Sequence, residues 1–106
     1  MVTPVFRQRA LDDVERYEDW RQGTNPEWEP IADDLLDAVR QAVAKYPSFS
    51  EIPFKPLAVR GLVAPVKRLF VPVRSKLFVV YVGAGRRSGE ITIRRIRHPS
   101  QRPIDT

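Results

Sequence analysis

The amino-acid sequence predicts an α+β protein in two layers, with a helical hairpin packed on a mainly antiparallel sheet. In the first half of the chain, apolar residues recur every three or four positions, which is typical of amphipathic helices. In the second half they alternate or run continuously in segments rich in Val, Ile and Phe, which is typical of strands. The chain has 106 residues, 42% of them hydrophobic, so we expect a single domain over residues 1–106 with one core.

The chain is expected to open with a short strand and a long helix. Residues 2–6 fit an edge strand, because Pro4 cannot donate a hydrogen bond to a central ladder. A helix is predicted over residues 8–22, with Gly23 as its C-cap. Its apolar stripe has a spacing of three: Leu11, Val14, Tyr17 and Trp20.

A second helix should follow after a short turn. We expect it to begin between Pro26 and Pro30, with Pro30 in its first turn, and to end at Pro47. Two helices joined by a short turn are expected to pack as an antiparallel hairpin against one face of the sheet.

Three strands are predicted in the second half, after a proline-rich connection over residues 47–65. They cover residues 66–73, 76–82 and 91–97, with a tight turn at residues 74–75 and a glycine-rich loop over 83–89. The alternation slips between Ile93 and Ile96, which indicates a β-bulge. The element order is therefore β-α-α-β-β-β, and sequential strands with short turns pair antiparallel.

Composition excludes several classes of site. The chain has no cysteine and one histidine, so disulfides, thiolate catalysis, Cys-based metal centres and multi-His metal sites are excluded. We expect no metal and no cofactor. No apolar run approaches the roughly 20 residues that span a bilayer, and the first nine residues already hold two arginines. We therefore expect a cytoplasmic protein without a membrane partner.

Charge is distributed very unevenly along the chain. Residues 1–53 hold 6 Lys/Arg and 11 Asp/Glu, whereas residues 54–106 hold 12 and 2, so the two halves carry net charges of −5 and +10. This asymmetry points to a polyanionic or acidic partner for the second half. A solvated basic surface that only aids solubility is the alternative.

Three stretches resemble the RelE/ParE superfamily of bacterial toxins from type II toxin–antitoxin systems. The first is the segment from Phe6 to Tyr17, with its helix opening Ala-Leu-Asp-Asp-Val. The second is Arg-Leu-Phe-Val-Pro at 68–72, followed by Leu-Phe-Val-Val-Tyr at 77–81. The third is the closing strand and basic end, Ile-Thr-Ile-Arg-Arg-Ile-Arg-His at 91–98. Together these stretches span nearly the whole chain, and the resemblance rests on their order and spacing.

The resemblance implies a toxin that is neutralised by a cognate antitoxin, with one of two mechanisms. ParE-like members inhibit DNA gyrase. RelE-like members are metal-independent ribonucleases that cut messenger RNA at the ribosome. No tyrosine lies beyond Tyr81 and the chain has only four lysines, which favours the ParE-like mechanism. A basic nucleic-acid-binding module without toxicity is the third hypothesis.

The candidate site residues depend on that choice. If the protein is RelE-like, His98 would transfer protons, while Arg68 and Arg95 would stabilise the transition-state charge. A terminal histidine also occurs in ParE-like sequences, where it implies no catalysis. The remaining candidates for binding a target or a nucleic acid are Lys55, Arg60, Arg74, Arg94 and Arg97.

Two pairs of consecutive arginines leave a geometric question open. Arg94 and Arg95 point to opposite faces of a regular strand, unless a bulge intervenes. Arg86 and Arg87 lie in a glycine-rich loop that resembles a nest for an anion, although an ordinary surface loop explains them equally.

Overall fold

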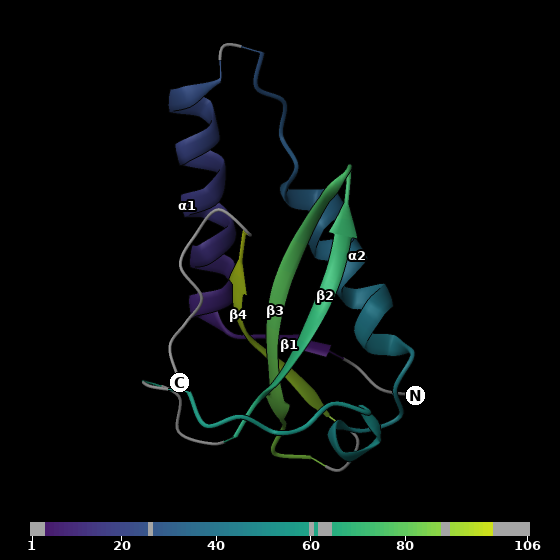
Figure 1. Ribbon diagram of the computed structural model, residues 1–106. Helices are drawn as coiled ribbons and strands as arrows, with labels where there is room; N and C mark the ends of the chain where they lie inside the picture. The colour runs from purple at the N-terminus through teal and green to yellow at the C-terminus, as the bar shows by residue number, and fades with distance from the viewer. Residues whose placement is uncertain (1–3, 26, 60, 62–64, 88–89, 99–106) are drawn as a thin grey trace.

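The computed structural model describes residues 4–25, 27–59, 61, 65–87 and 90–98, and it confirms the α+β class (Figure 1). The elements are β1 (Pro4–Phe6), α1 (Gln8–Thr24), α2 (Ala32–Ala44), a 3-10 turn η1 (Phe49–Glu51), β2 (Lys67–Val73), β3 (Lys76–Ala84) and β4 (Ile91–Arg97). Within the described parts of the chain, no helix has the length and apolar character needed to cross a bilayer.

The four strands form one mixed sheet in the order β1-β4-β3-β2. Strands β2, β3 and β4 pair antiparallel, as expected from their short connections. Strand β1 joins at the far side and runs parallel to β4, so the first strand of the chain lies beside the last. This parallel pair makes the sheet mixed.

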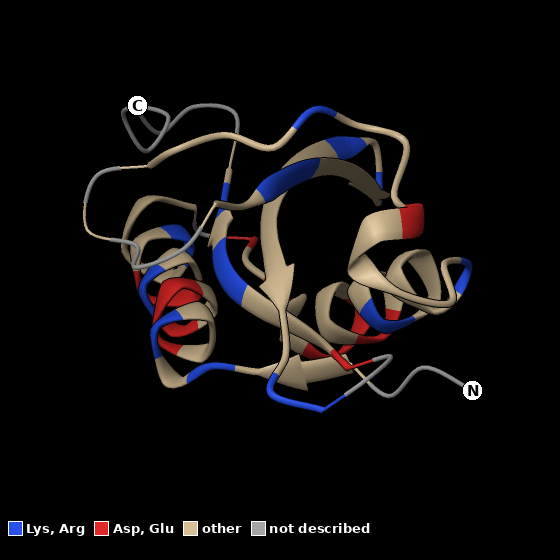
Figure 2. Ribbon diagram, turned by 90° about the horizontal axis from the view of Figure 1, so that it is seen from below, with Lys and Arg blue, Asp and Glu red and all other residues tan. Residues whose placement is uncertain are grey.

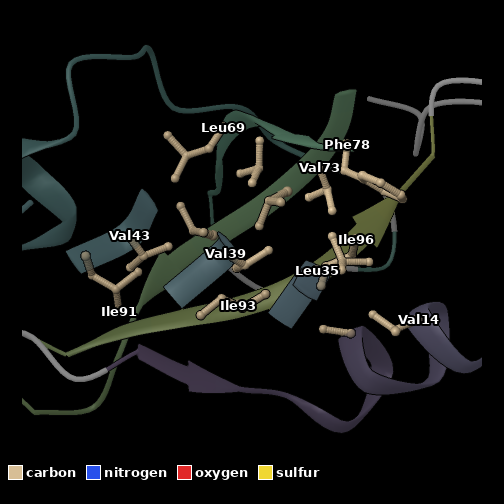
Figure 3. Close-up of a cluster of buried hydrophobic side chains, with 14 of the residues drawn as sticks. Val14, Leu35, Val39, Val43, Leu69, Val73, Phe78, Ile91, Ile93 and Ile96 are labelled. Carbon is tan, nitrogen blue, oxygen red and sulfur yellow. The ribbon is translucent and has the colours of Figure 1, made fainter. Parts of the chain in front are cut away.

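The two helices contact the strands more than each other. Helix α1 packs mainly on β4, and α2 packs mainly on β2. In Figure 2 the two helices lie apart, at the left and right of the view. They do not form the expected close helical hairpin, and each helix packs separately on the same sheet. Both helices contribute to a single apolar core with β2, β3 and β4 (Figure 3).

The helix boundaries differ from the sequence prediction. Helix α1 runs through Gly23 to Thr24, whose hydroxyl donates to the Trp20 carbonyl at 2.9 Å, so Gly23 is not the C-cap. Helix α2 begins at Ala32, which places Pro30 before the helix. The reason is Ile31: its side chain is buried and its N–H donates to the Glu18 carboxylate at 3.0 Å, which fixes the chain just before the first helical turn.

The predicted bulge is confirmed in β4. Tyr81 of β3 pairs with Arg95 and the next residue, Val82, pairs with Ile93, which leaves Arg94 as the extra residue. Strand β3 extends two residues beyond its predicted end at Val82, because Gly83 and Ala84 still pair with the start of β4.

The tight turn between β2 and β3 is also confirmed. Arg74 and Ser75 are the two turn residues, with φ of 48° and 66°. Positive φ at both central positions is the signature of a type I′ turn, whose twist matches that of the flanking strands.

Candidate functional site

The sheet has one face turned away from the helices, and it collects most of the candidate residues. Along β2, β3 and β4 the core side chains point toward the helices, so alternate residues point the other way. We call this the open face and define it by ten residues: Arg68, Phe70, Pro72, Leu77, Val79, Tyr81, Thr92, Arg94, Arg95 and Arg97. Figure 2 shows Asp and Glu mostly on the helices, while Lys and Arg lie along the strands and also on both helices.

Two candidate arginines flank one tyrosine across this face. Arg68 of β2 and Arg95 of β4 are both paired with Tyr81 of the central strand β3. Directly opposed residues have Cβ atoms about 4.5–5.5 Å apart, so the three side chains form one row. The next row contains Phe70, Val79 and Arg97.

The bulge brings Arg94 to the same face as Arg95. A Cβ built on Gly83 would lie 3.1 Å from Nε of Arg94, so the guanidinium covers the bare backbone of Gly83. Arg94 Nε donates to the Thr92 hydroxyl at 2.9 Å, and that hydroxyl donates to the Gly83 carbonyl at 3.1 Å. Burial, followed by the positive charge of Arg7, lowers the pKa of Arg94. The open face therefore gathers four arginines.

Arg95 is held by a carboxylate of α1, Asp13, which the sequence pattern did not single out. Its Nε and Nη2 donate to the two oxygens of Asp13 at 2.7 and 2.9 Å, and the Ile96 N–H donates to the same carboxylate at 2.9 Å. The hydrogen bond that Arg95 donates to Asp13 is the main cause that raises the pKa of Arg95. Strand β1 ends at Phe6, which pairs with Ile93, so no strand of the described chain lies beside the rest of β4 on that edge. Helix α1 covers this edge instead, and its Asp13 accepts a hydrogen bond from a backbone N–H that would otherwise have no partner.

Tyr81 is covered by the proline-rich connection. Its side chain is buried and packs with Val59 and Val66 in a small second cluster. The backbones of Leu57 and Val66 exchange hydrogen bonds of 2.7 and 2.8 Å, which fixes the connection against the end of β2. The connection therefore covers the part of the open face around Tyr81, and the exposed part of this face lies beyond it.

His98 lies on the opposite side of the sheet. Its ring stacks on Tyr17 at a centroid distance of 4.8 Å and meets Phe78 edge-on at 5.4 Å. Both partners belong to the core shared with the helices. Burial lowers the pKa of His98, and the positive charges of Lys76 and Arg21 lower it further.

The remaining candidates are scattered. Arg74 lies in the β2–β3 turn, and its guanidinium donates to Asp34 of α2 at 2.6 and 2.9 Å. Lys55 is exposed in the connection. Arg60 lies outside the described residues. Among the described residues there is no group of three or more His, Asp or Glu side chains placed to hold a metal ion.

The open face also exposes large apolar side chains. Phe70 is 55% exposed and Leu77 is 46% exposed, although both lie in strands with a well-packed opposite face. Exposed apolar residues beside arginines are typical of protein–protein interfaces. The predicted strands already placed these two residues on the face opposite their neighbours. Because both faces of the strands carry apolar residues, the periodicity did not show which face the helices cover.

Comparison with protein-family models and with curated proteins finds no match to this chain.

Proposed function

We propose that this protein is the toxin of a type II toxin–antitoxin system, arrests growth by inhibiting DNA gyrase, and is neutralised by a cognate antitoxin. The proposal rests on the resemblance of its three sequence stretches to the RelE/ParE superfamily. The β-α-α-β-β-β order and the antiparallel β2-β3-β4 sheet agree with the fold that the resemblance implies. The open face is the surface we propose for the target.

The position of His98 is the single observation that favours gyrase inhibition over RNA cleavage. Cleavage by the 2′-hydroxyl needs a proton-transfer group and a charge-stabilising cation on the same phosphodiester. His98 stacks on Tyr17 beneath the helices, whereas Arg68 lies on the open face, so the sheet separates the two groups. Arg95, the other arginine proposed to stabilise transition-state charge, already donates two hydrogen bonds to the carboxylate of Asp13.

A RelE-like ribonuclease is the second candidate, because the arginines of the open face suit a polyanion. Arg68, Arg94 and Arg97 lie on this face in addition to Arg95, and phosphate contacts of this kind dominate affinity for nucleic acids. The same surface would also serve a basic nucleic-acid-binding module without toxicity. These hypotheses share the surface and differ in what the protein does to its target.

Inducible expression in bacteria separates the three hypotheses. We expect wild-type protein to stop growth, with filamentation and a DNA-damage response, and co-expression of the antitoxin to restore growth. Arg68→Glu should relieve the arrest, because it reverses the charge of an exposed arginine on the open face. Arg16→Glu is the matched control, since Arg16 is an exposed arginine on α1.

The ribonuclease hypothesis makes a different prediction for His98→Ala. Loss of a general acid or base lowers a rate by about 10²–10⁴, so arrest and message cutting would both disappear. Under our proposal His98→Ala leaves the arrest nearly intact. Normal growth with soluble wild-type protein would contradict both toxin hypotheses and leave the binding module.

A further inference from the structure

A second basic site lies at the end of the sheet where β3 ends and β4 begins, and it shares no residue with the open-face row of Arg68, Tyr81 and Arg95. The segment around η1 and the loop between β3 and β4 border a hollow of about 370 Å³. Both segments lie at the lower end of the molecule in Figure 1. Small-ligand sites usually begin near about 300 Å³, so the hollow has room for a compact ligand rather than a bare ion.

One wall of the hollow carries two arginines. Arg86 and Arg87 line it from the β3–β4 loop, and both are exposed. Among the described residues neither arginine has an ion pair or a hydrogen bond from its side chain. Unpaired guanidinium groups at the rim of a concave surface are the preferred protein partners of phosphate.

The segment around η1 supplies hydroxyl groups to the lining. Ser48 and Ser50 line the hollow, and their hydroxyls are hydrogen-bonded to each other at 3.0 Å. One of the two hydroxyls donates in that bond, so the other keeps its proton free for an anionic group. The lining thus takes donors from two separate segments of the chain.

Hydrogen bonds hold the backbone of both segments, whereas none from a described residue holds the exposed side chains of Arg86 and Arg87. The buried ammonium of Lys67 donates to the carbonyls of Phe49 and Ile52 at 2.8 Å each and lies 4.6 Å from the centre of the Phe49 ring. In the loop, Gly85 N–H donates to the Glu90 carbonyl at 2.8 Å, and Glu90 N–H donates to the Arg87 carbonyl at 3.0 Å. A preorganised site loses less conformational entropy on binding.

Glu90 restricts the class of ligand. It lines the hollow too, and its side chain packs so closely on Gly85 that a Cβ there would lie 2.4 Å from Cγ of Glu90. Its carboxylate adds an acceptor among the donors. That combination fits a ligand with hydroxyl groups next to its phosphate better than inorganic phosphate alone.

From these observations we infer that the hollow between η1 and the β3–β4 loop binds a hydroxyl-bearing phosphate monoester of the size of a nucleoside monophosphate. Arg86 and Arg87 would pair with the phosphate, the free proton of the Ser48–Ser50 hydroxyl pair would be donated to it, and Glu90 would accept from a sugar hydroxyl. This inference does not depend on the toxin activity. A free nucleotide and the phosphorylated 5′ end of an RNA strand both carry this chemistry.

Amide chemical shifts of the purified protein, followed during titration with AMP, test the inference. We expect saturable shifts at residues 48–50, 85–87 and 90, and no such shifts with adenosine. Arg86→Gln/Arg87→Gln should weaken AMP binding about tenfold or more, because two charge-assisted contacts are lost. The control Arg16→Gln/Lys45→Gln removes two charges from the helices and should change the affinity less than about twofold.

RNA tetranucleotides with a 5′-phosphate and with a 5′-hydroxyl distinguish the sources. Binding of AMP without the phosphorylated tetranucleotide identifies a free nucleotide as the ligand, and binding of both identifies the strand end as well. Three results would overturn the inference: adenosine binding as well as AMP, equal weakening in the variant and its control, or no shifts at millimolar AMP. Binding of both tetranucleotides with the same measurable affinity would also overturn it, because internal phosphodiesters would then explain the binding.

Discussion

Asp13 is the residue through which α1, β4 and the open face depend on one another. Its side chain is 4% exposed, and that of its partner Arg95 is 14% exposed. Asp13→Ala would leave a guanidinium and the Ile96 N–H without their acceptor. We expect a loss of about 3 kcal/mol in the free energy of unfolding, measured by urea unfolding at neutral pH. Asp19→Ala, an exposed change on the same helix, should cost under about 0.5 kcal/mol. A cost at Asp13 no larger than that would show that the clamp is unimportant.

His98 should make stability depend on pH. Burial against Tyr17 and Phe78 lowers the pKa of His98, with Lys76 and Arg21 adding to the effect, so the unfolded chain binds its proton more tightly. The contribution is complete above the unfolded pKa of about 6.5 and is lost as the pH falls below it. Urea unfolding at several pH values should show wild-type protein losing more stability on acidification than His98→Phe, which keeps an aromatic ring. Parallel profiles for the two proteins would contradict this assignment.

Among the elements, the β2–β3 turn contains a residue whose substitution should increase the stability of the protein. Ser75 has φ of 66°, a left-handed conformation that glycine adopts without a Cβ penalty. Ser75→Gly should raise the free energy of unfolding by about 0.5 kcal/mol. Ser75→Ala keeps the Cβ and should give no gain. If both variants had the same stability, strain at this position would not be the cause.

The elements show how far the sequence pattern reaches. The bulge was predictable, because a period of two that slips between Ile93 and Ile96 leaves one residue over. Its consequence for Arg94 was not, since that depends on the bare backbone of Gly83 across the strand pair. The start of α2 also escaped prediction, because a tertiary hydrogen bond from Ile31 to Glu18 sets it rather than the nearby prolines.

The candidate site was also predictable only in part, because tertiary contacts decide which of its residues are available. The resemblance to RelE-like sequences singled out Arg68 and Arg95, and the strand register places both beside Tyr81. Spacing did not reveal that Arg95 is occupied by Asp13, which comes from a helix 82 positions away in sequence. In the periodic pattern Asp13 lies off the apolar stripe, so it looked like a solvated residue.

At the scale of the whole molecule, the charge asymmetry should govern association. The second half of the chain carries a net charge of +10, and four of its arginines lie on the open face. We expect the association rate with the cognate antitoxin to fall steeply as ionic strength rises, while Arg68→Glu slows association at low salt. Stopped-flow mixing at several salt concentrations measures both effects. A rate independent of salt would remove the electrostatic part of the account.

We propose that the open face acts on gyrase and that His98 has a structural role. Purified protein should be assayed side by side for inhibition of gyrase supercoiling and for message cleavage on translating ribosomes. We predict blocked supercoiling by wild-type protein and by His98→Ala, loss of inhibition in Arg68→Glu but not in Arg16→Glu, and uncut message throughout. Discrete message cuts that vanish in His98→Ala, with supercoiling unaffected, would contradict the account.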